Sequence, residues 1–350
     1  MKNQSQLVEE PQKIYFLGIG GIGMSALAYY FLSQGKEVYG YDSTPTSLTE
    51  TLQKKGAKIH FDEDISQIPE GIDLVVHTPA VGTHHQEYQY FIERKIPIYK
   101  RSQILGLITQ SYPTIAIAGT HGKTTTTAMV ATILHPETPI IAFIGGVAKN
   151  FDTNFLLDAQ AQCAVVEADE FDRSFLTLSP TVAVITSMDA DHLDIYGDKS
   201  HLEESFQLFA NRVPEDGTLI VHEAVAERVN HPHKITYGLH PNNDYCISEV
   251  VLAPETATFK LHQQRQQQVG KQGVLTPCPF QESISLQVSG MQNVEGRRQN
   301  AECRMQNAEC RRQNAERRRQ NAEGRRRKHL LASVWDAQCT QCHGGNSCCH

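Results

Sequence analysis

The chain has 350 residues, of which 20% are charged, and a formal net charge of −7. This length predicts two or three domains, and because no apolar run approaches 18 residues, we expect no transmembrane helix. Residues 1–12 form a polar, acidic N-terminal tail without the apolar stretch of a signal peptide. These features predict a cytoplasmic protein that has no membrane partner.

Residues 13–42 are predicted to form a β-α-β unit. An apolar strand at 13–17 runs into the glycine-rich stretch 18–23, a helix follows, and the next strand ends at Asp42, 24 residues after Gly18. Such a loop brings backbone N–H groups close to a diphosphate, and the acidic residue can accept a ribose hydroxyl. The pattern fits NAD or a UDP-sugar, and glycines that serve only helix–sheet packing would also produce it.

The chain continues with further α/β structure up to a boundary at Ser111-Tyr112-Pro113. Buried strands are expected near 74–78 and 96–99, with helices near 84–95 and 102–110. Residues 13–111 are therefore predicted to be a Rossmann-like domain.

A second glycine-rich turn follows the apolar strand 114–118. It reads Gly119-Thr-His-Gly-Lys-Thr-Thr-Thr-Thr127 and opens a predicted helix at 123–134. Backbone N–H groups of such a turn can surround a triphosphate, Lys123 can neutralise its charge, and the Thr124 hydroxyl can reach Mg²⁺. Ile117 stands where the common phosphate-loop pattern has its first glycine, and a strand, turn and helix with a chance lysine is the alternative.

Residues 112–295 are predicted to form a second, P-loop-type α/β domain. Strands are expected near 114–118, 140–144, 163–167, 181–187 and 218–221, with a helix near 200–213 and a more β-like region at 232–290. Acidic clusters follow two of these strands, at Glu167-Ala-Asp169-Glu170 and at Asp189-Ala-Asp191-His192-Leu-Asp194. Because the carboxyl ends of parallel strands face the ligand crevice, these side chains could hold Mg²⁺; solvated acidic loops are the alternative.

The segment 296–350 differs from the rest of the chain. A seven-residue unit of the type Arg-Arg-Gln-Asn-Ala-Glu-Cys recurs there, and six of the nine cysteines lie in the last 48 residues. The period suggests a coiled coil, but large apolar residues are missing from the repeat. The dense arginines could also indicate an RNA-binding stretch, but no aromatic residues alternate with them in the repeat. A tandem repeat of seven bases in the DNA, read in triplets, also produces a seven-residue period in the protein, so this segment is interpreted as translated repetitive DNA. We therefore expect a disordered or helical low-complexity tail and no nucleic-acid partner.

Four ordered motifs together resemble the Mur ligase family. They are Gly18-Ile-Gly-Gly-Ile-Gly-Met-Ser25, Gly119-Thr-His-Gly-Lys-Thr-Thr125, Glu167-Ala-Asp-Glu170 with Ser174-Phe-Leu176, and Asp191-His-Leu-Asp194. The resemblance covers residues 13–295. The resemblance implies an ATP- and Mg²⁺-dependent ligase of peptidoglycan synthesis. Such an enzyme joins L-alanine to UDP-N-acetylmuramic acid through an acyl phosphate.

The resemblance also implies roles for individual residues. Lys123, Glu167 and His192 would be catalytic, and Thr124, Glu167 and His192 would surround Mg²⁺. The ATP-binding set would be Gly119, Thr120, His121, Gly122, Lys123, Thr124, Thr125 and Asn293. The UDP-sugar-binding set would be Gly18, Gly20, Gly21, Ile22, Gly23, Met24, Ser25 and Asp42.

The chain departs from the family pattern after the central domain. The family continues with a motif of the type His-Asn-x-x-Asn, where this chain has Gln292-Asn293-Val294-Glu295-Gly296, and then with a third domain that supplies the amino-acid pocket. We therefore expect a truncated ligase with impaired activity. A non-catalytic UDP-sugar- and ATP-binding fragment and a murein-tripeptide-recycling ligase are the alternatives. An NAD-dependent oxidoreductase is disfavoured by the Lys-Thr phosphate loop. The sequence does not predict the oligomeric state.

Overall fold

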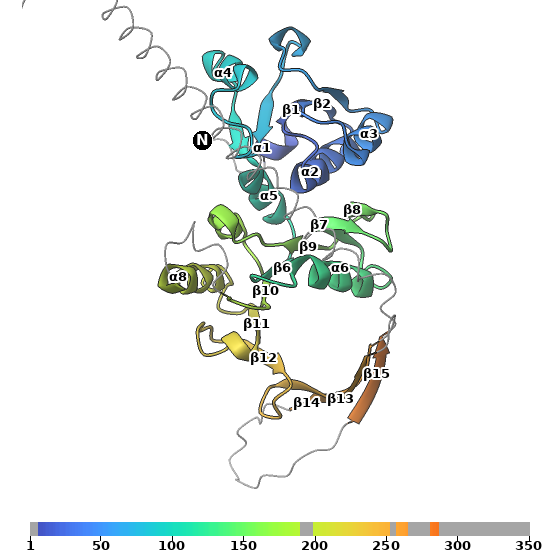
Figure 1. The fold of residues 1–350 in the computed structure, drawn as a ribbon, viewed down its shortest axis with the longest axis vertical. Coiled ribbons are helices and arrows are strands. Elements are labelled where there is room, and N and C mark those ends of the chain that lie inside the picture. The colour runs from blue at the N-terminus through green and yellow to red at the C-terminus, as the bar shows by residue number, and fades with distance from the viewer. Residues whose placement is uncertain (1–5, 190–198, 253–256, 265–280, 287–350) are drawn as a thin grey trace, which may run out of the picture. The chain divides into compact units, whose positions relative to one another are not determined.

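The computed structural model describes residues 6–189, 199–252, 257–264 and 281–286. Helices and strands alternate along most of this length, and the strands form two separate sheets (Figure 1). The predicted α/β fold is confirmed. The repeat tail and the predicted sites His192 and Asn293 lie outside the described residues.

The first sheet is parallel throughout and has the strand order β3-β2-β1-β4-β5. Its strands are β1 (Lys13–Leu17), β2 (Glu37–Tyr41), β3 (Lys58–His60), β4 (Leu74–His77) and β5 (Ile98–Lys100). The accompanying helices are α2 (Ile22–Ser33), α3 (Ser47–Lys54), η1 (Ile65–Gln67), α4 (Gln86–Glu93) and α5 (Arg101–Thr109). The chain direction across the sheet reverses at β1, which is where doubly wound folds bind nucleotides.

Burial explains why these segments form strands. Four of the five residues of β1 are fully buried, as expected for a parallel strand that is covered on both faces. The strand at 58–60 and the helix at 47–54 were not predicted. The strand, β3, gives a weak signal because it has only three residues and none of them is fully buried. The segment predicted as an N-terminal tail contains a short helix, α1 (Gln6–Glu9), whose Val8 side chain is buried.

Among the described residues the second sheet has ten strands, in the order β15-β14-β13-β12-β11-β10-β6-β9-β7-β8. They are β6 (Thr114–Ala118), β7 (Ile140–Ala148), β8 (Thr153–Leu157), β9 (Cys163–Glu167), β10 (Val182–Ile185), β11 (Thr218–His222), β12 (Lys234–Gly238), β13 (Tyr245–Leu252), β14 (Ala257–Gln263) and β15 (Gln281–Leu286). The accompanying helices are α6 (Lys123–Leu134), η2 (Phe171–Thr177), α8 (Lys199–Ala210) and η3 (Glu223–Val225). The seven neighbouring strands β7, β9, β6, β10, β11, β12 and β13 pair in parallel, whereas β8, β14 and β15 are antiparallel to their neighbours.

Strand β6 and its two neighbours in the sheet, β9 and β10, bring three loops together. Strand β6 lies between β10 and β9, and all three run in the same direction. Their carboxyl ends therefore place the turn at 119–122, the acidic residues 167–170 and the residues 186–189 at one edge. The structure thus places the first predicted acidic cluster, and Asp189 of the second, at the same edge as the phosphate loop, whereas residues 190–194 of the second cluster lie outside the described residues.

Helix α2 joins the two sheets in one core. Its Tyr29 ring stacks on Phe155 of β8 with centroids 6.5 Å apart, and its Tyr30 ring lies 6.3 Å from Phe143 of β7. One continuous cluster of buried apolar side chains includes Phe16 and Phe31 of the first sheet region as well as Phe143. The glycine-rich loop that precedes α2 is thereby fixed relative to β7 and β8.

Candidate functional site

The turn between β6 and α6 requires both of its glycines. Gly119 has a φ of +135° and Gly122, the residue that precedes α6, has a φ of +80°. A Cβ atom at Gly119 would collide with Thr186 Oγ1 of the neighbouring loop. Side chains are therefore excluded where the backbone folds around the start of the helix, as the phosphate-loop interpretation predicts.

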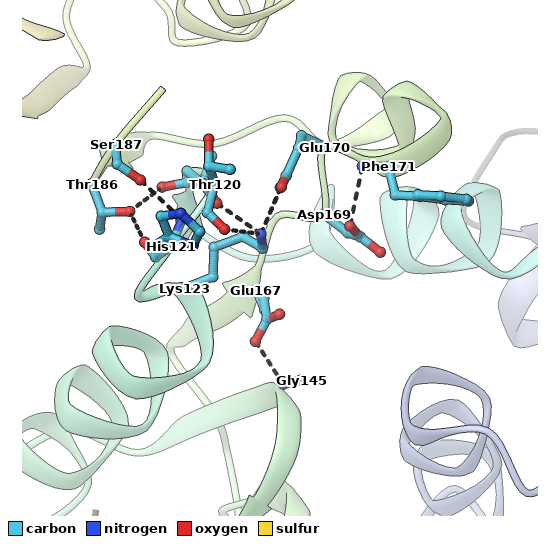
Figure 2. A network of polar contacts seen from close by, with 12 residues as sticks. Thr120, His121, Lys123, Gly145, Glu167, Asp169, Glu170, Phe171, Thr186 and Ser187 are labelled. Carbon is cyan, nitrogen blue, oxygen red and sulfur yellow. Dashed lines mark hydrogen bonds and ion pairs between the residues drawn. The ribbon is translucent and has the colours of Figure 1, made fainter. Parts of the chain in front are cut away.

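Lys123 is the first residue of α6, and its amine is held at the centre of this turn (Figure 2). Its Nζ donates to Gly119 O at 2.7 Å and to Glu170 Oε1 at 2.8 Å, and Glu170 Oε2 lies 2.7 Å away. Both side chains are at most 3% exposed. A buried, paired ammonium beside a glycine turn can exchange its carboxylate partner for a phosphate without entering water.

Glu170 belongs to the acidic cluster that the sequence placed at this edge, but its role as the partner of Lys123 was not predicted. The two residues are 47 positions apart, and no periodicity links them. The signal that could have found Glu170 is its position after a strand adjacent to β6, combined with the rule that a buried lysine needs a counter-charge.

Thr124 places its hydroxyl inside the turn. The residue is 7% exposed, and among the described residues its Oγ1 has no hydrogen-bond partner. A buried hydroxyl without a partner costs about 1–3 kcal/mol, so a ligand, a metal ion or an ordered water is expected to supply the missing partner. The prediction that Thr124 contacts Mg²⁺ fits this geometry, whereas Thr125 is half-buried and carries no comparable signal.

Glu167 ends β9, beside the end of β6. Its Oε2 accepts a hydrogen bond from the Gly145 N–H at 3.0 Å, and a Cβ atom at Gly145 would collide with the carboxylate (Figure 2). Glu167 is thus placed at the predicted edge and directed by the backbone of β7. Within the described ranges no group of three or more His, Cys, Asp or Glu residues is close enough to hold a metal ion, and His192, the third predicted ligand, lies outside them.

The loop after β10 holds the phosphate loop from the opposite side. Ser187 Oγ accepts from the His121 N–H at 2.9 Å, and the Thr120 N–H donates to Ser187 O at 3.2 Å. Thr120 Oγ1 in turn accepts from the Asp189 N–H at 3.0 Å. The N–H groups of Thr120 and His121 are therefore used within the protein, which leaves those of Gly122 and the first turn of α6 for an anion. Ser187 was not predicted as part of the site.

The first glycine-rich loop is fixed by Asp42 at the end of β2. The Gly20 N–H donates to Asp42 Oδ2 at 2.7 Å and the Thr44 N–H donates to Oδ1 at 3.1 Å. The carboxylate thus supports the loop, which is an additional role beside the predicted contact with the nucleotide. Gly18 has a φ of +85° and a Cβ there would lie 2.6 Å from Thr78 Cγ2, so this turn also depends on glycine.

The remaining predicted residues of this loop divide by exposure. Gly20, Gly21, Ile22 and Gly23 are at least partly exposed, whereas Met24 and Ser25 are buried. Ser25 Oγ donates to Ile22 O at 2.9 Å and accepts from Asn154 Nδ2 at 3.0 Å. A ligand at this loop would therefore meet the backbone of Gly20–Gly23 before the side chains of Met24 and Ser25.

Sequence comparison matches the chain to two known domain families in succession. The description "Mur ligase family, catalytic domain" applies to residues 13–113 and "Mur ligase middle domain" to residues 117–295. No helix in the described part of the chain is long and apolar enough to cross a membrane.

The curated relatives and solved structures agree with this match. A UDP-N-acetylmuramate–L-alanine ligase from Christiangramia forsetii is 44% identical over 254 residues, which are 71% of this chain and 55% of that protein. A ligase of the same name from Phocaeicola vulgatus is 49% identical over 220 residues, 61% of this chain and 48% of that protein. The crystal structure of such a ligase from Thermotoga maritima superposes with a TM-score of 0.66 at 29% identity, covering 81% of this chain and 62% of that one. The chain spans about half the length of the curated relatives it matches.

Proposed function

The chain belongs to the Mur ligase family, and we propose on this basis that it takes part in the ATP-dependent joining of L-alanine to UDP-N-acetylmuramic acid. The observation that carries the proposal is the buried Lys123 amine at the glycine turn, next to the Thr124 hydroxyl that has no partner among the described residues. That combination suits a triphosphate and its metal ion. The relatives supply the identity of the sugar nucleotide and of the amino acid.

The proposal divides the two nucleotides between two domains. Residues 13–111 would bind the UDP-sugar and residues 112–295 would bind ATP. Since both nucleotides are cytoplasmic metabolites, the proposal also places the reaction in the cytoplasm.

In the proposed reaction, the muramoyl carboxylate takes the γ-phosphoryl group of ATP and ADP leaves. The amine of L-alanine then attacks the acyl phosphate, forms the amide bond with loss of a proton, and releases inorganic phosphate. Lys123 would neutralise the transferring phosphoryl group by exchanging its contact with Glu170 for a phosphate oxygen. The N–H groups of Gly122 and the first turn of α6 would bind the remaining phosphate oxygens. These N–H groups are already in position before ATP binds, so the turn would orient the phosphates without a rearrangement of its backbone.

The residues present also fit a magnesium ion. Thr124 Oγ1 is buried and has no hydrogen-bond partner among the described residues, and Glu167 presents carboxylate oxygens at the same sheet edge. Oxygen ligands of these kinds suit Mg²⁺. Thr124 and Glu167 would hold the ion, with His192 as the third group by family resemblance. Bound there, Mg²⁺ would neutralise phosphate charge.

Titration calorimetry with the 350-residue chain tests the proposal. We expect ATP with Mg²⁺ and UDP-N-acetylmuramic acid each to bind, and Lys123→Met to lose ATP while it keeps the UDP-sugar. Thermal unfolding of the variant confirms that it is folded. If neither nucleotide binds the unmodified chain, the proposal is wrong.

A ligation assay distinguishes the possible functions that remain. The amine is supplied either as L-alanine or as the murein tripeptide, and the product is separated by chromatography. Product with L-alanine alone supports the proposal, product with the tripeptide favours a recycling ligase, and binding without either product favours a non-catalytic role.

A further inference from the structure

Arg101 is a cation that lies between the two proposed nucleotide sites. It is the first residue of α5, and a Cβ atom placed on Gly23 would lie 2.8 Å from both its Cδ and Nη1 atoms. Its Nη2 is 3.6 Å from Asp169 Oδ2, and Asp169 belongs to the same acidic loop as Glu170. The guanidinium therefore covers the first turn of α2 and reaches the loop that holds Lys123.

The start of α5 is fixed firmly enough to aim this side chain. Thr177 Oγ1 donates to Ser102 O at 2.8 Å, and the Lys100 N–H donates to Gln103 Oε1 at 2.8 Å. Gly106, one turn further on, lies so close to Thr177 that a side chain there would meet backbone. Arg101 thus projects from an anchored helix end.

The first turn of α2 is suited to an anion. Its N-terminal residue, Gly21, provides no side-chain cap, and the earliest intrahelical bond is from the Ser25 N–H to Gly21 O at 2.8 Å. The N–H groups of Ile22, Gly23 and Met24 therefore have no acceptor within the helix. These groups carry the positive end of the helix dipole, and the Arg101 side chain lies beside Gly23 in the same turn.

A buried amide holds this turn from the side of β8. Asn154 is fully buried, and its Nδ2 donates to Ile22 O at 2.6 Å and to Ser25 Oγ at 3.0 Å. Its Oδ1 has no hydrogen-bond partner in the described part of the chain. The turn is thus pre-positioned by a fully buried side chain of β8.

The ion pair with Asp169 does not by itself explain Arg101. The two side chains are 23% and 40% exposed and 3.6 Å apart, and pairs of this kind contribute about 0–1 kcal/mol to stability. A guanidinium, by contrast, binds phosphate oxygens in a bidentate manner, with stronger, charge-assisted hydrogen bonds. A contact with a phosphate group would therefore contribute more binding free energy than the ion pair with Asp169 contributes to stability.

We propose that Arg101 binds the diphosphate of the UDP-sugar together with the free N–H groups of α2, and that Asp169 holds the guanidinium when the diphosphate is absent. The inference rests on the proposed function, which supplies the UDP-sugar. It adds a diphosphate-binding residue from α5, far from the glycine motif in sequence. It also links occupation of the first site to the acidic loop of the second, because binding releases Asp169.

The test compares Arg101→Gln and Arg101→Lys with the unmodified 350-residue chain. UDP-N-acetylmuramic acid and UDP-N-acetylglucosamine are titrated separately, since both have the diphosphate and only the first has the carboxylate. We expect Arg101→Gln to weaken both by roughly 10- to 100-fold, from the loss of a charge-assisted hydrogen bond, with partial recovery in Arg101→Lys. ATP affinity should not change.

Asp169→Asn should shift affinity in the opposite direction. The variant keeps an oxygen to accept the Phe171 N–H, which now donates to Asp169 Oδ1 at 3.1 Å, but it releases Arg101. Both UDP-sugars should bind about two- to fivefold more tightly, as expected for removal of a partly exposed ion pair. A purely structural role for Arg101 would predict no gain.

Arg94→Gln is the matched control, because Arg94 stacks on the Tyr90 ring at 3.6 Å and lies outside both sites. Arg101→Gln with unchanged affinity for both UDP-sugars would overturn the inference while leaving the proposed function intact. A loss confined to UDP-N-acetylmuramic acid would also overturn it, because that result assigns Arg101 to the carboxylate. If the unmodified chain bound neither UDP-sugar, the proposed function would fail first and the inference with it.

Discussion

Lys123 and Glu170 illustrate how a single buried pair can serve both folding and ligand binding. Their side chains are 3% and 2% exposed, so each charge depends on the other for compensation. Removing one partner of a buried pair costs about 3–5 kcal/mol, whereas replacing both with neutral groups costs far less. The stability of variants at these two positions should therefore be strongly non-additive.

We predict that Lys123→Met lowers the free energy of unfolding by about 3 kcal/mol and that adding Glu170→Gln recovers a large part of the loss. The reason is that the second change removes the uncompensated carboxylate. Urea denaturation of the two single variants and the double variant measures the coupling. Strictly additive losses would show that the pair is not coupled in the folded chain.

Gly119 is the position in the phosphate loop where a side chain is least tolerable. It combines a φ of +135° with a collision between any Cβ atom and Thr186 Oγ1. Gly119→Ala should therefore lower the free energy of unfolding by at least about 1–2 kcal/mol, as measured by denaturant titration. Gly82→Ala is the matched control, because nothing lies within 4 Å of a Cβ there, and it should stay within about 0.5 kcal/mol of the parent chain.

Glu87 makes stability depend on pH. Its side chain is fully buried, and burial raises the pKa of its carboxyl above the usual range. The groups that face it are the Tyr15 hydroxyl at 2.6 Å, the His60 ring at 3.6 Å, the Asp64 N–H at 3.3 Å and the nearby His85. The folded chain thus keeps this proton to a higher pH than the unfolded chain does.

The direction in which stability changes with pH follows from the difference in proton binding between the folded and unfolded chains. Between the unfolded carboxyl pKa of about 4.3 and the raised folded pKa, unfolding releases a proton, so stability falls as the pH rises through this window. Glu87→Gln should reduce that fall, as measured by urea denaturation at a series of pH values. Glu50→Gln, at an exposed position of α3, is the control and should leave the slope unchanged. Equal slopes for parent and Glu87→Gln would contradict the prediction.

At the level of elements, the contact between β8 and α2 determines how the first glycine loop is held. Asn154 reaches across 132 positions of sequence to the Ile22 carbonyl. We predict that Asn154→Leu lowers the free energy of unfolding by about 1–3 kcal/mol, the cost of leaving buried partners unsatisfied, and weakens UDP-sugar binding. Asn150→Leu, which changes an exposed amide just before β8, should do neither. Titration and denaturation of both variants check the two effects.

The elements that could be predicted from the sequence are those with a clear local signal. The strands at 13–17, 114–118 and 163–167 and the helix at 123–134 were placed at their observed bounds, because each strand is a short apolar run and the helix follows a glycine turn. Strand β8 was missed, since it lies at the edge of the sheet and only two of its five residues, Asn154 and Phe155, are buried. The low burial of β3 explains the same failure there.

Across the whole molecule, local motifs located the two loops but not the residues that hold them. The glycines of both turns and Lys123 are recognisable from spacing alone. Glu170, Ser187, Arg101 and Asn154 contact these turns from distant parts of the chain, so only the folded arrangement of strands identifies them. The roles of His192 and Asn293 stay predictions, because both residues lie beyond the described ranges.

The continuous core predicts how the molecule unfolds. Because buried side chains of both sheets pack around α2 in one cluster, the parts that would bind the UDP-sugar and ATP should unfold together. We therefore expect one calorimetric transition that either nucleotide raises, with about 2.7 kcal/mol of added stability at a ligand concentration 100 times its Kd. Both nucleotides together should raise the same transition further. Two transitions, each shifted by a single nucleotide, would show instead that the packing of Tyr29 on Phe155 and of Tyr30 on Phe143 is too weak to couple the two sheets.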